Sequence, residues 1–165
     1  ESIVQQFLDL ARAREPQLDR QRVDPLVRSA ARAAEPAFRA AQQRLEVHTE
    51  PVTAVSDGQF VAEIVDNLLR NAREASSAGG RVWIDVRRVE GDVVLAVEDE
   101  GPGVPPELRE RVFDMFFTTR PRGTGLGLSI VSRLAATMGG GVRIENRTGG
   151  GARIVTHWPI EGATT

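Results

Sequence analysis

Residues Asp99-Glu100-Gly101-Pro102-Gly103 follow an alternating run, 93–97, that predicts a β-strand. A carboxylate at the end of a buried strand can accept a hydrogen bond from an exocyclic amine, such as that of adenine. Gly101 and Gly103 have no side chain, so a flat base can approach their backbone closely. The same residues are ordinary turn formers. Taken alone, the stretch therefore fits either a turn or the base end of a nucleotide pocket.

The composition limits the class of protein. A chain of 165 residues with 41% hydrophobic residues predicts one domain, with or without an appendage. The net charge is −2, from 21 basic and 23 acidic residues, so the overall charge of the chain does not attract nucleic acid or an anionic membrane. The absence of cysteine excludes disulfides, thiolate metal sites and a cysteine nucleophile. Every basic residue is arginine, so any role of a lysine must fall to an arginine.

Hydrophobic periodicity and turn residues predict an alternation of helices and strands. Asp24 and Pro25 predict a helix start, with Asp24 as N-cap, and Pro36 is expected to kink or split that helix. The helices are expected at 1–15, 24–41, 57–76, 105–112 and 124–138. The strands are expected at 45–50, 53–55, 82–86, 93–97, 142–145 and 153–158.

The helix at 57–76 has three distinct faces when its residues are placed at 100° intervals. The core face holds Val61, Ile64, Val65, Leu68, Leu69, Ala72 and Ala75. A narrow arc beside it holds Glu63, Asn67, Asn71 and Glu74, and the solvent arc holds Asp66, Arg70 and Arg73. Asparagine is a poor helix former, and amide oxygens suit Mg²⁺ or can approach phosphates. The two asparagines therefore indicate either a cation and phosphate site or a solvated rim.

A second glycine cluster, Gly123-Thr124-Gly125-Leu126-Gly127-Leu128, leads into the helix at 124–138. The amide-rich N-terminus of a helix suits a polyphosphate. Between the two clusters lies a loop, 113–123, in which Phe113 and Phe116 are expected to be anchors. Arg120 and Arg122 in this loop are either solvated or positioned to bind phosphate.

Four segments, taken in order, closely resemble the N, G1, F and G2 boxes of bacterial sensor histidine kinases. They are Asn67-Leu68-Leu69-Arg70-Asn71-Ala72, Asp99-Glu100-Gly101-Pro102-Gly103, Phe113-Asp114-Met115-Phe116 and Gly123-Thr124-Gly125-Leu126-Gly127-Leu128. These kinases belong to the superfamily of gyrase, MutL and heat-shock ATPases, and the resemblance covers roughly residues 20–160. It implies a two-layer α/β sandwich of the Bergerat type, a mixed sheet covered on one face by helices.

The resemblance implies ATP and Mg²⁺ as ligands and a role for each matching residue. Asn71 matches the asparagine that coordinates Mg²⁺, and Asp99 matches the aspartate that binds the adenine amine. Gly101 and Gly103 shape the adenine wall. The implied nucleotide-binding set is Asn71, Asp99, Gly101, Gly103, Phe116, Arg122, Gly123, Thr124, Gly125, Leu126, Gly127 and Leu128.

The resemblance also implies the residues of the transfer step. Asn67 stands where the hydrolases of the superfamily have a water-activating glutamate, and an amide cannot act as a general base. This favours phosphoryl transfer to a protein side chain over hydrolysis. Glu63 is a candidate acid/base helper, and Arg120 a candidate for neutralising phosphate charge.

The resemblance extends to the ends of the chain. Residues 1–16 resemble the tail of a dimerisation and phosphoacceptor helix, although their apolar stripe could instead cover the main core. The catalytic domain is then 17–160, and 161–165 form a tail. His48 and His157 lack the setting of an acceptor histidine, so we expect the chain to be a piece of a longer protein.

Some residues depart from the family pattern. Ala152 follows Gly151 where a hydroxyl residue is usual, so Thr156 or water would have to supply the hydroxyl. The lid, 117–123, is short and resembles that of the nitrogen-regulator branch, with Arg120 in place of the lid lysine.

With this resemblance, the sequence predicts the catalytic domain of a histidine kinase whose full-length form is a homodimer, and places it in the cytoplasm, either in a cytoplasmic protein or in the cytoplasmic portion of a membrane-anchored sensor. Its partners would be its own dimerisation domain and a cognate response regulator, with no role for nucleic acid. Two alternatives remain: an ATPase that uses hydrolysis to change conformation, and a non-catalytic regulatory module with the same fold.

Overall fold

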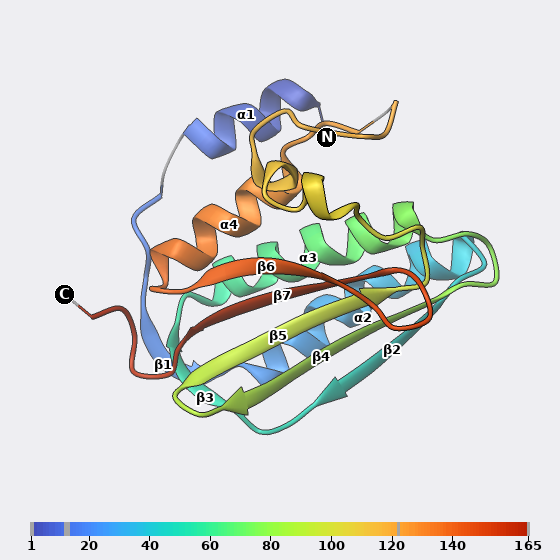
Figure 1. Cartoon of the computed structure of the whole chain (residues 1–165). Helices are drawn as coiled ribbons and strands as arrows, with labels where there is room; N and C mark the ends of the chain where they lie inside the picture. Colours follow the sequence, from blue (N-terminus) through green and yellow to red (C-terminus); the bar gives the residue numbers. More distant parts are fainter. Residues whose placement is uncertain (1, 12–13, 122, 165) are drawn as a thin grey trace.

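The computed structural model describes residues 2–11, 14–121 and 123–164. Single strands or pairs of consecutive strands are separated by helices along this part of the chain (Figure 1). The helices are α1 Ile3–Ala11, α2 Asp24–Ala40, α3 Gly58–Ala75 and α4 Gly127–Thr137, with 3₁₀ turns η1 Pro106–Leu108 and η2 Arg111–Phe113. The strands are β1 Asp19–Arg22, β2 Arg44–Thr49, β3 Thr53–Ser56, β4 Arg81–Val89, β5 Asp92–Asp99, β6 Gly141–Asn146 and β7 Ala152–Pro159.

The main sheet has five strands in the order β2-β4-β5-β7-β6. Strand β2 runs parallel to β4, and the other neighbours are antiparallel, so the sheet is mixed. Strands β1 and β3 form a separate antiparallel pair. Strand β5 is central, and Asp99 is its last residue.

Helices α2, α3 and α4 cover one face of this sheet (Figure 1). The expected core face of α3 is confirmed from Val61 to Ala72, since each of its residues in that range is at most 1% exposed. These side chains pack against buried valines, leucines and isoleucines of β4, β5 and β7. Trp158 of β7 is fully buried, and its Nε1 donates a hydrogen bond to Ser56 Oγ at 2.8 Å. The predicted two-layer α/β sandwich is therefore confirmed.

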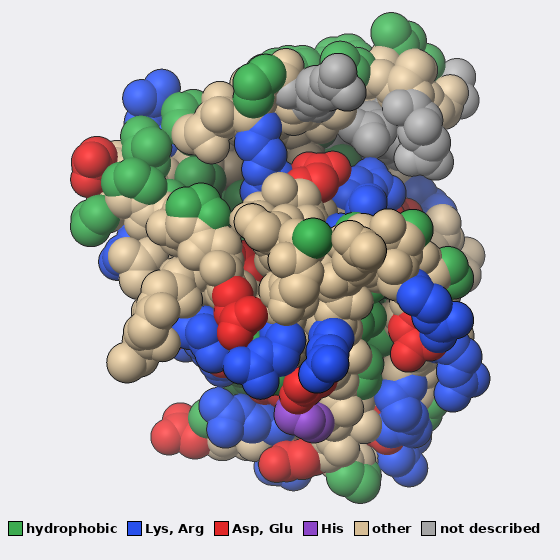
Figure 2. Space-filling view, turned by 90° about the vertical axis from the view of Figure 1, so that its right-hand side faces the viewer, with side chains coloured by type: hydrophobic (Ala, Val, Ile, Leu, Met, Phe, Trp, Pro, Cys, Tyr) green, Lys and Arg blue, Asp and Glu red, His purple; other side chains and the backbone are tan. Residues whose placement is uncertain are grey.

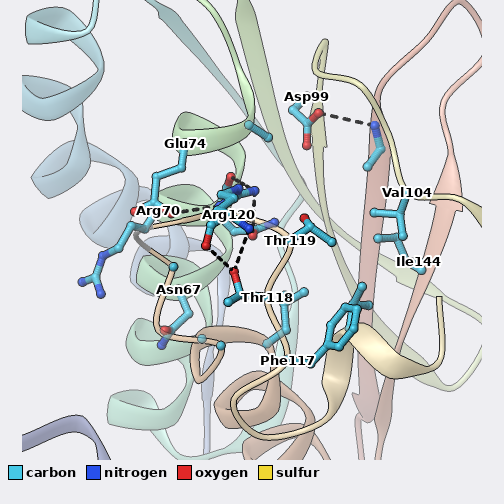
Figure 3. A pocket seen from close by; sticks show the side chains of 18 of the residues that line it. Asn67, Arg70, Glu74, Asp99, Val104, Phe117, Thr118, Thr119, Arg120 and Ile144 are labelled. Atoms are coloured by element: carbon cyan, nitrogen blue, oxygen red, sulfur yellow. Dashed lines mark hydrogen bonds and ion pairs between the residues drawn. The ribbon is translucent and has the colours of Figure 1, made fainter. Parts of the chain in front are cut away.

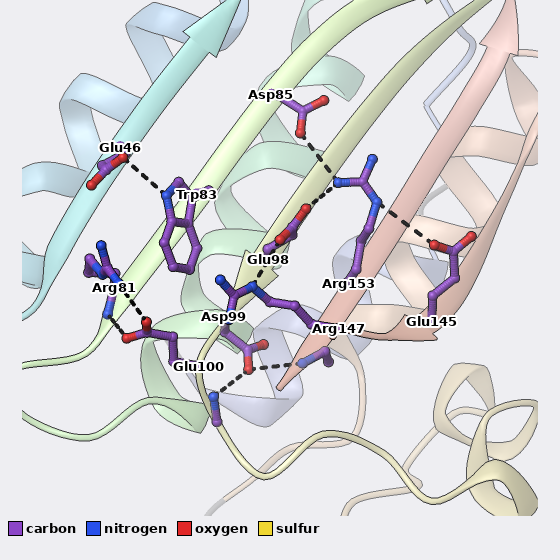
Figure 4. Close-up of polar contacts among 12 residues, drawn as sticks. Glu46, Arg81, Trp83, Asp85, Glu98, Asp99, Glu100, Glu145, Arg147 and Arg153 are labelled. Atoms are coloured by element: carbon purple, nitrogen blue, oxygen red, sulfur yellow. Dashed lines mark hydrogen bonds and ion pairs between the residues drawn. The ribbon is translucent and has the colours of Figure 1, made fainter. Parts of the chain in front are cut away.

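The opposite face of the sheet is polar (Figure 4). One cross-strand row over all five strands consists of Glu46, Trp83, Glu98, Arg153 and Glu145. Charged neighbours in this row form ion pairs, and the guanidinium groups of Arg81 and Arg147 lie over the Trp83 ring. In Figure 2, acidic and basic side chains are likewise interspersed over the lower part of the face in view.

Helix α1 lies outside the sandwich, above α4 in Figure 1. Its apolar residues Ile3, Val4, Phe7 and Leu8 are 37–66% exposed. The alternative in which this stripe covers the main core is therefore wrong. Phe7 instead stacks on Phe116, with ring centroids 6.1 Å apart.

The segment that follows α1 in the described chain is attached to the N-terminus of α3. Asp57, the N-cap of α3, is 2% exposed and accepts hydrogen bonds from Gln59 N and Phe60 N. Its second carboxylate oxygen accepts from Arg14 Nη2 and Gln17 N, both at 2.7 Å. The domain boundaries near residues 16 and 160 stay predictions.

Two expectations about the start of the domain need correction. Strand β1 is absent from the predicted elements, because Asp19–Arg22 has no apolar alternation. Asp24 is not the N-cap of α2, which is Val23. Its buried carboxylate instead accepts bonds from Arg22, Arg28 and Val52 N.

The other corrections concern helix continuity. Helix α2 is not split at Pro36, because Pro36 lies on the exposed side, where water can bond the carbonyl that loses its partner. The helix expected at 105–112 is two separate 3₁₀ turns, η1 and η2. In the described residues, no helix is both long enough and apolar enough to cross a membrane.

Candidate functional site

A pocket of about 870 Å³ lies between α3, the end of β5 and the loop that precedes α4 (Figure 3). Four parts of the chain meet there: the polar side of α3, residues 99–104, residues 117–120 with 123–125, and the start of α4. The β6–β7 hairpin adds Ile144 and Ala152. The pocket therefore joins the segments that carry the predicted N, G1 and G2 boxes.

Asp99 marks one end of this pocket. Its side chain is 2% exposed, and Oδ1 accepts hydrogen bonds from Gly101 N at 2.9 Å and Ala152 N at 3.4 Å. Burial raises the pKa of Asp99, although these two N–H groups act in the opposite direction. No hydrogen bond to Oδ2 is found within the described residues, so this oxygen can accept from a ligand.

The glycines around Asp99 are required by close backbone contacts. A Cβ at Gly101 would lie 2.5 Å from the carbonyl oxygen of Ala75. Gly151, with φ +100°, approaches the carbonyl oxygen of Asp99 so closely that a Cβ there would overlap it. Gly103 has φ +75°. The backbones of α3, the end of β5 and the β6–β7 turn therefore pack closely together around Asp99.

The opposite end of the pocket is formed by α3. Asn67, Asn71 and Glu74 line it, together with Asp66 and Arg70, which the helical pattern assigned to the solvent arc. Asp66 and Arg70 form an ion pair at 2.7 Å, and their side chains are 60% and 38% exposed, so they lie at its rim. Asn67 Nδ2 donates to the Glu63 carbonyl at 2.8 Å.

Arg120 reaches from the loop onto this side of α3 (Figure 3). Its Nη1 donates to Glu74 Oε2 at 2.8 Å. Its Nη2 lies 3.2 Å from both the carbonyl oxygen and the Oδ1 of Asn71. A guanidinium cation therefore already occupies the oxygen atoms of Asn71 in this structure.

The second glycine cluster forms the turn that enters α4. Gly123, Thr124, Gly125, Gly127 and Leu128 line the pocket. Gly125, with φ +71°, packs against the backbone of Phe116, and a Cβ at Gly127 would lie 3.3 Å from Asn67 Oδ1. The N-terminus of α4 therefore faces the asparagine side of α3, where an anion would meet the positive end of the helix.

Residues 56–162 match the family described as "Histidine kinase-, DNA gyrase B-, and HSP90-like ATPase". The chain belongs to this ATPase family. It is a catalytic ATP-binding domain of the kind found in two-component sensor histidine kinases. The chain spans between 13% and 26% of the length of three curated relatives that it matches.

One relative and two solved structures illustrate the similarity. The nitrogen regulation protein NtrY of Azorhizobium caulinodans is 31% identical over 171 residues, covering 97% of this chain and 22% of NtrY. Full-length ShkA in complex with AMPPNP is 32% identical with a TM-score of 0.84, covering 99% of this chain and 35% of ShkA. Histidine kinase ThkA in complex with the response regulator TrrA is 27% identical with a TM-score of 0.81, covering 96% of this chain and 46% of that chain.

In this histidine kinase-type domain, most of the predicted site residues lie together, but four of the described ones do not line the pocket: Glu63, Gly101, Leu126 and Phe116. Glu63 is outside the lining, and its carbonyl oxygen is held by Asn67. Leu126 is fully buried, and its N–H donates to Thr124 Oγ1 at 3.3 Å. Arg122 lies outside the described residues. Their roles as ligand contacts stay predictions.

Phe116 is the fourth of these residues, and it does not anchor the loop on the core of the domain. The side chain is 54% exposed and stacks on Phe7. Its φ of +65° turns the backbone, and the next residue, Phe117, lines the pocket instead. Phe113 packs against the core, as expected.

The site also contains residues that the sequence reasoning did not assign. Val104, Ile144 and Ala152 give the Asp99 end an apolar wall, and Ala152 N helps to hold the Asp99 carboxylate. Thr156 is fully buried and is not in the lining, so it does not supply the missing hydroxyl. The hairpin pattern could have indicated Ile144 and Ala152, since both belong to strands next to β5 or its neighbour.

The donor set at Asn71 fits a hard cation. Amide and carbonyl oxygens are ligands that Mg²⁺ accepts, and it usually keeps several waters and substrate phosphates beside one or two protein ligands. Asn71 Oδ1 already faces a positive charge, that of Arg120. Among the described residues, no cluster of three or more acidic or histidine side chains offers a competing site.

Proposed function

We propose that this domain binds Mg-ATP and transfers the γ-phosphoryl group to a histidine of a dimerisation and phosphoacceptor domain. The observation that carries the proposal is the pocket itself, with buried Asp99 at one end and Asn71, Arg120 and the N-terminus of α4 at the other. This separation matches a nucleotide, whose base needs an acceptor and whose phosphates need positive charge.

In this proposal, Asp99 Oδ2 accepts a hydrogen bond from the adenine amine, while Gly101 N and Ala152 N hold the carboxylate. Val104, Ile144 and Ala152 contact the faces of the base. The backbone around Gly123–Gly127 and the α4 N-terminus bind the phosphates.

Asn71 holds the cation, which supplies charge neutralisation across the phosphates when bound. Arg120 neutralises further charge at the γ-phosphate. In the transfer, a nitrogen of the acceptor imidazole forms a bond to γ-phosphorus as the bond to the bridging oxygen of ADP breaks. The protein contributes positioning and charge stabilisation rather than covalent chemistry.

Asn67 supports transfer rather than hydrolysis. Its Nδ2 is committed to the Glu63 carbonyl, and an amide cannot remove a proton from water. Appreciable ATP hydrolysis by this chain, abolished in Glu63→Gln, would favour the ATPase alternative instead.

Several wider features belong to the same proposal. The short loop 117–123 and the similarity to NtrY support placement in the nitrogen-regulator branch. The response regulator found with ThkA supports a response regulator as the downstream partner. The full-length protein would be a homodimer through the helix that α1 continues, and it would act on the cytoplasmic side, where ATP is available.

The test is a titration of the wild-type chain and Asp99→Asn with ATP and ADP, with and without Mg²⁺. We expect wild type to bind both nucleotides, more tightly with Mg²⁺, and Asp99→Asn to bind at least about tenfold more weakly, since a buried acceptor is replaced. Equal binding by Asp99→Asn would refute the adenine assignment. Failure of wild type to bind at millimolar nucleotide would favour the non-catalytic module.

A further inference from the structure

Arg120 is held on α3 by three acceptor atoms from two residues. Glu74 Oε2 accepts from Nη1 at 2.8 Å, and the carbonyl oxygen and Oδ1 of Asn71 accept from Nη2, each at 3.2 Å. The Arg120 and Glu74 side chains are 34% and 44% exposed, so this contact lies at the mouth of the pocket and not in its floor.

The loop presents Arg120 to α3 through its own hydrogen bonds. Arg120 N donates to Thr118 Oγ1 at 3.0 Å, and Gly123 N donates to the Arg120 carbonyl at 3.1 Å. A Cβ at Gly123 would overlap Thr118 Oγ1, so the turn is tightly closed. The guanidinium position is therefore set jointly by this turn and by Glu74.

This arrangement places two cations in competition for Asn71 Oδ1. A metal ion at that oxygen would lie within a few ångströms of the Arg120 guanidinium, and like charges at that distance repel. A guanidinium on Asn71 therefore has to move when the cation arrives. The incoming phosphates offer it new acceptors, with which arginine forms bidentate hydrogen bonds.

We propose that Glu74 is a positioning residue, which holds Arg120 on Asn71 and keeps the cation position closed until nucleotide and Mg²⁺ displace the guanidinium together. The inference rests on the proposed Mg-ATP binding and deepens it, because it says which groups occupy the same site before the nucleotide binds. Glu74 acts through Arg120 and not as a ligand of the metal.

Glu74→Gln tests this assignment because it weakens the ion pair while leaving Arg120 and Asn71 in place. The matched control is Glu145→Gln, since Glu145 is 45% exposed and pairs with Arg143 at 2.9 Å on the opposite face of the sheet. The Mg²⁺ concentration that gives half-maximal ADP binding is measured for both variants and for wild type.

We expect Glu74→Gln to lower this Mg²⁺ concentration about two- to fivefold, the range for loss of one exposed ion pair. Glu145→Gln should leave it unchanged. In an Arg120→Gln background, Glu74→Gln should have no further effect, because the residue through which it acts is gone. An increase in the half-saturating Mg²⁺ concentration, in either background, would make Glu74 a metal ligand and overturn the proposal.

A second readout needs no nucleotide. Amide hydrogen exchange at Arg120 and Gly123 should be faster in nucleotide-free Glu74→Gln than in wild type, and unchanged in Glu145→Gln. Unchanged exchange in Glu74→Gln would overturn the holding role. Wild type could bind no nucleotide while amide exchange at Arg120 and Gly123 is still faster in Glu74→Gln. In that case the Mg-ATP proposal fails, but the contact between Glu74 and Arg120 is verified.

Discussion

The N–H of Gly101 donates a 2.9 Å hydrogen bond to Oδ1 of Asp99, two residues earlier at the end of β5. This bond holds Oδ1, and Asp99 lines the pocket although the residue is almost fully buried. A buried acid that is held in this way is costly for the fold when it is ionised, and such a cost is typical of a binding residue.

The first prediction concerns stability and pH in Asp99→Asn. Because burial raises the pKa of Asp99 in the folded state, ionisation destabilises the fold at neutral pH. We expect the nucleotide-free variant to be more stable than wild type at pH 7, and the difference to shrink as the pH falls through the folded pKa towards about 4. Chemical denaturation from pH 7 down to about 4 measures this. A variant less stable than wild type at pH 7 would contradict the expected cost of burial.

The second prediction compares two glycines of the β6–β7 turn. Gly149 and Gly151 have φ values of +91° and +100°, but a Cβ at Gly149 meets nothing within 4 Å, whereas one at Gly151 overlaps the Asp99 carbonyl. We expect Gly149→Ala to cost about 1–3 kcal/mol from backbone strain alone. Gly151→Ala should cost more and should also weaken ADP binding, because it displaces Asp99. If the two variants change the unfolding free energy and the ADP affinity equally, the close contact between Gly151 and the Asp99 carbonyl has no effect of its own.

The third prediction separates two consecutive aromatic residues. Phe117 lines the pocket, and its ring also lies 4.7 Å from the Arg111 guanidinium, whereas Phe116 is exposed and stacks on Phe7. We expect Phe117→Ala to weaken nucleotide binding about threefold or more. Phe116→Ala should change it little and should instead loosen α1, as seen by proteolysis near residues 3–11. A larger loss of affinity in Phe116→Ala would restore the role that the sequence resemblance implies.

The resemblance of four segments to sensor histidine kinases implied the fold class, which is confirmed, and the pocket brings together the segments that carry the N, G1 and G2 boxes. The core face of α3 followed from a 3.6-residue period, which is a local property of the chain. Pairing between strands is not local, so the order β2-β4-β5-β7-β6 had no sequence signal. Strand β1, with four polar residues, lacked any alternation to detect.

Two details of the site could not be predicted from the sequence, for a similar reason. The contact between Arg120 and Asn71 joins residues 49 positions apart, and nothing in either segment indicates the other. For the two adjacent phenylalanines, the choice of the ring that faces the pocket depends on a positive φ at Phe116, which is an uncommon conformation for a residue other than glycine.

The last prediction concerns Asp57, which connects the segment after α1 to the start of α3. Burial opposes its ionisation, but hydrogen bonds from Gln17 N, Arg14 and Phe60 N outweigh that effect and lower the pKa of Asp57. Asp57→Ala removes the cap and leaves Gln17 N without its acceptor, so we expect a loss of about 1–2 kcal/mol at pH 7.

Because the folded pKa of Asp57 is depressed, its stabilisation is present above about pH 4 and is lost as the pH falls through the folded pKa. The gap in unfolding free energy between wild type and Asp57→Ala should therefore narrow in acid. Arg14→Gln, which removes the partly exposed ion pair and the contact of the Arg14 guanidinium with the Phe60 ring but leaves the helix cap, is the control and should cost less than about 1 kcal/mol. If Arg14→Gln costs as much as Asp57→Ala, the ion pair and not the helix cap stabilises this junction. A gap that stays constant in acid would mean that the charge of Asp57 contributes nothing to it.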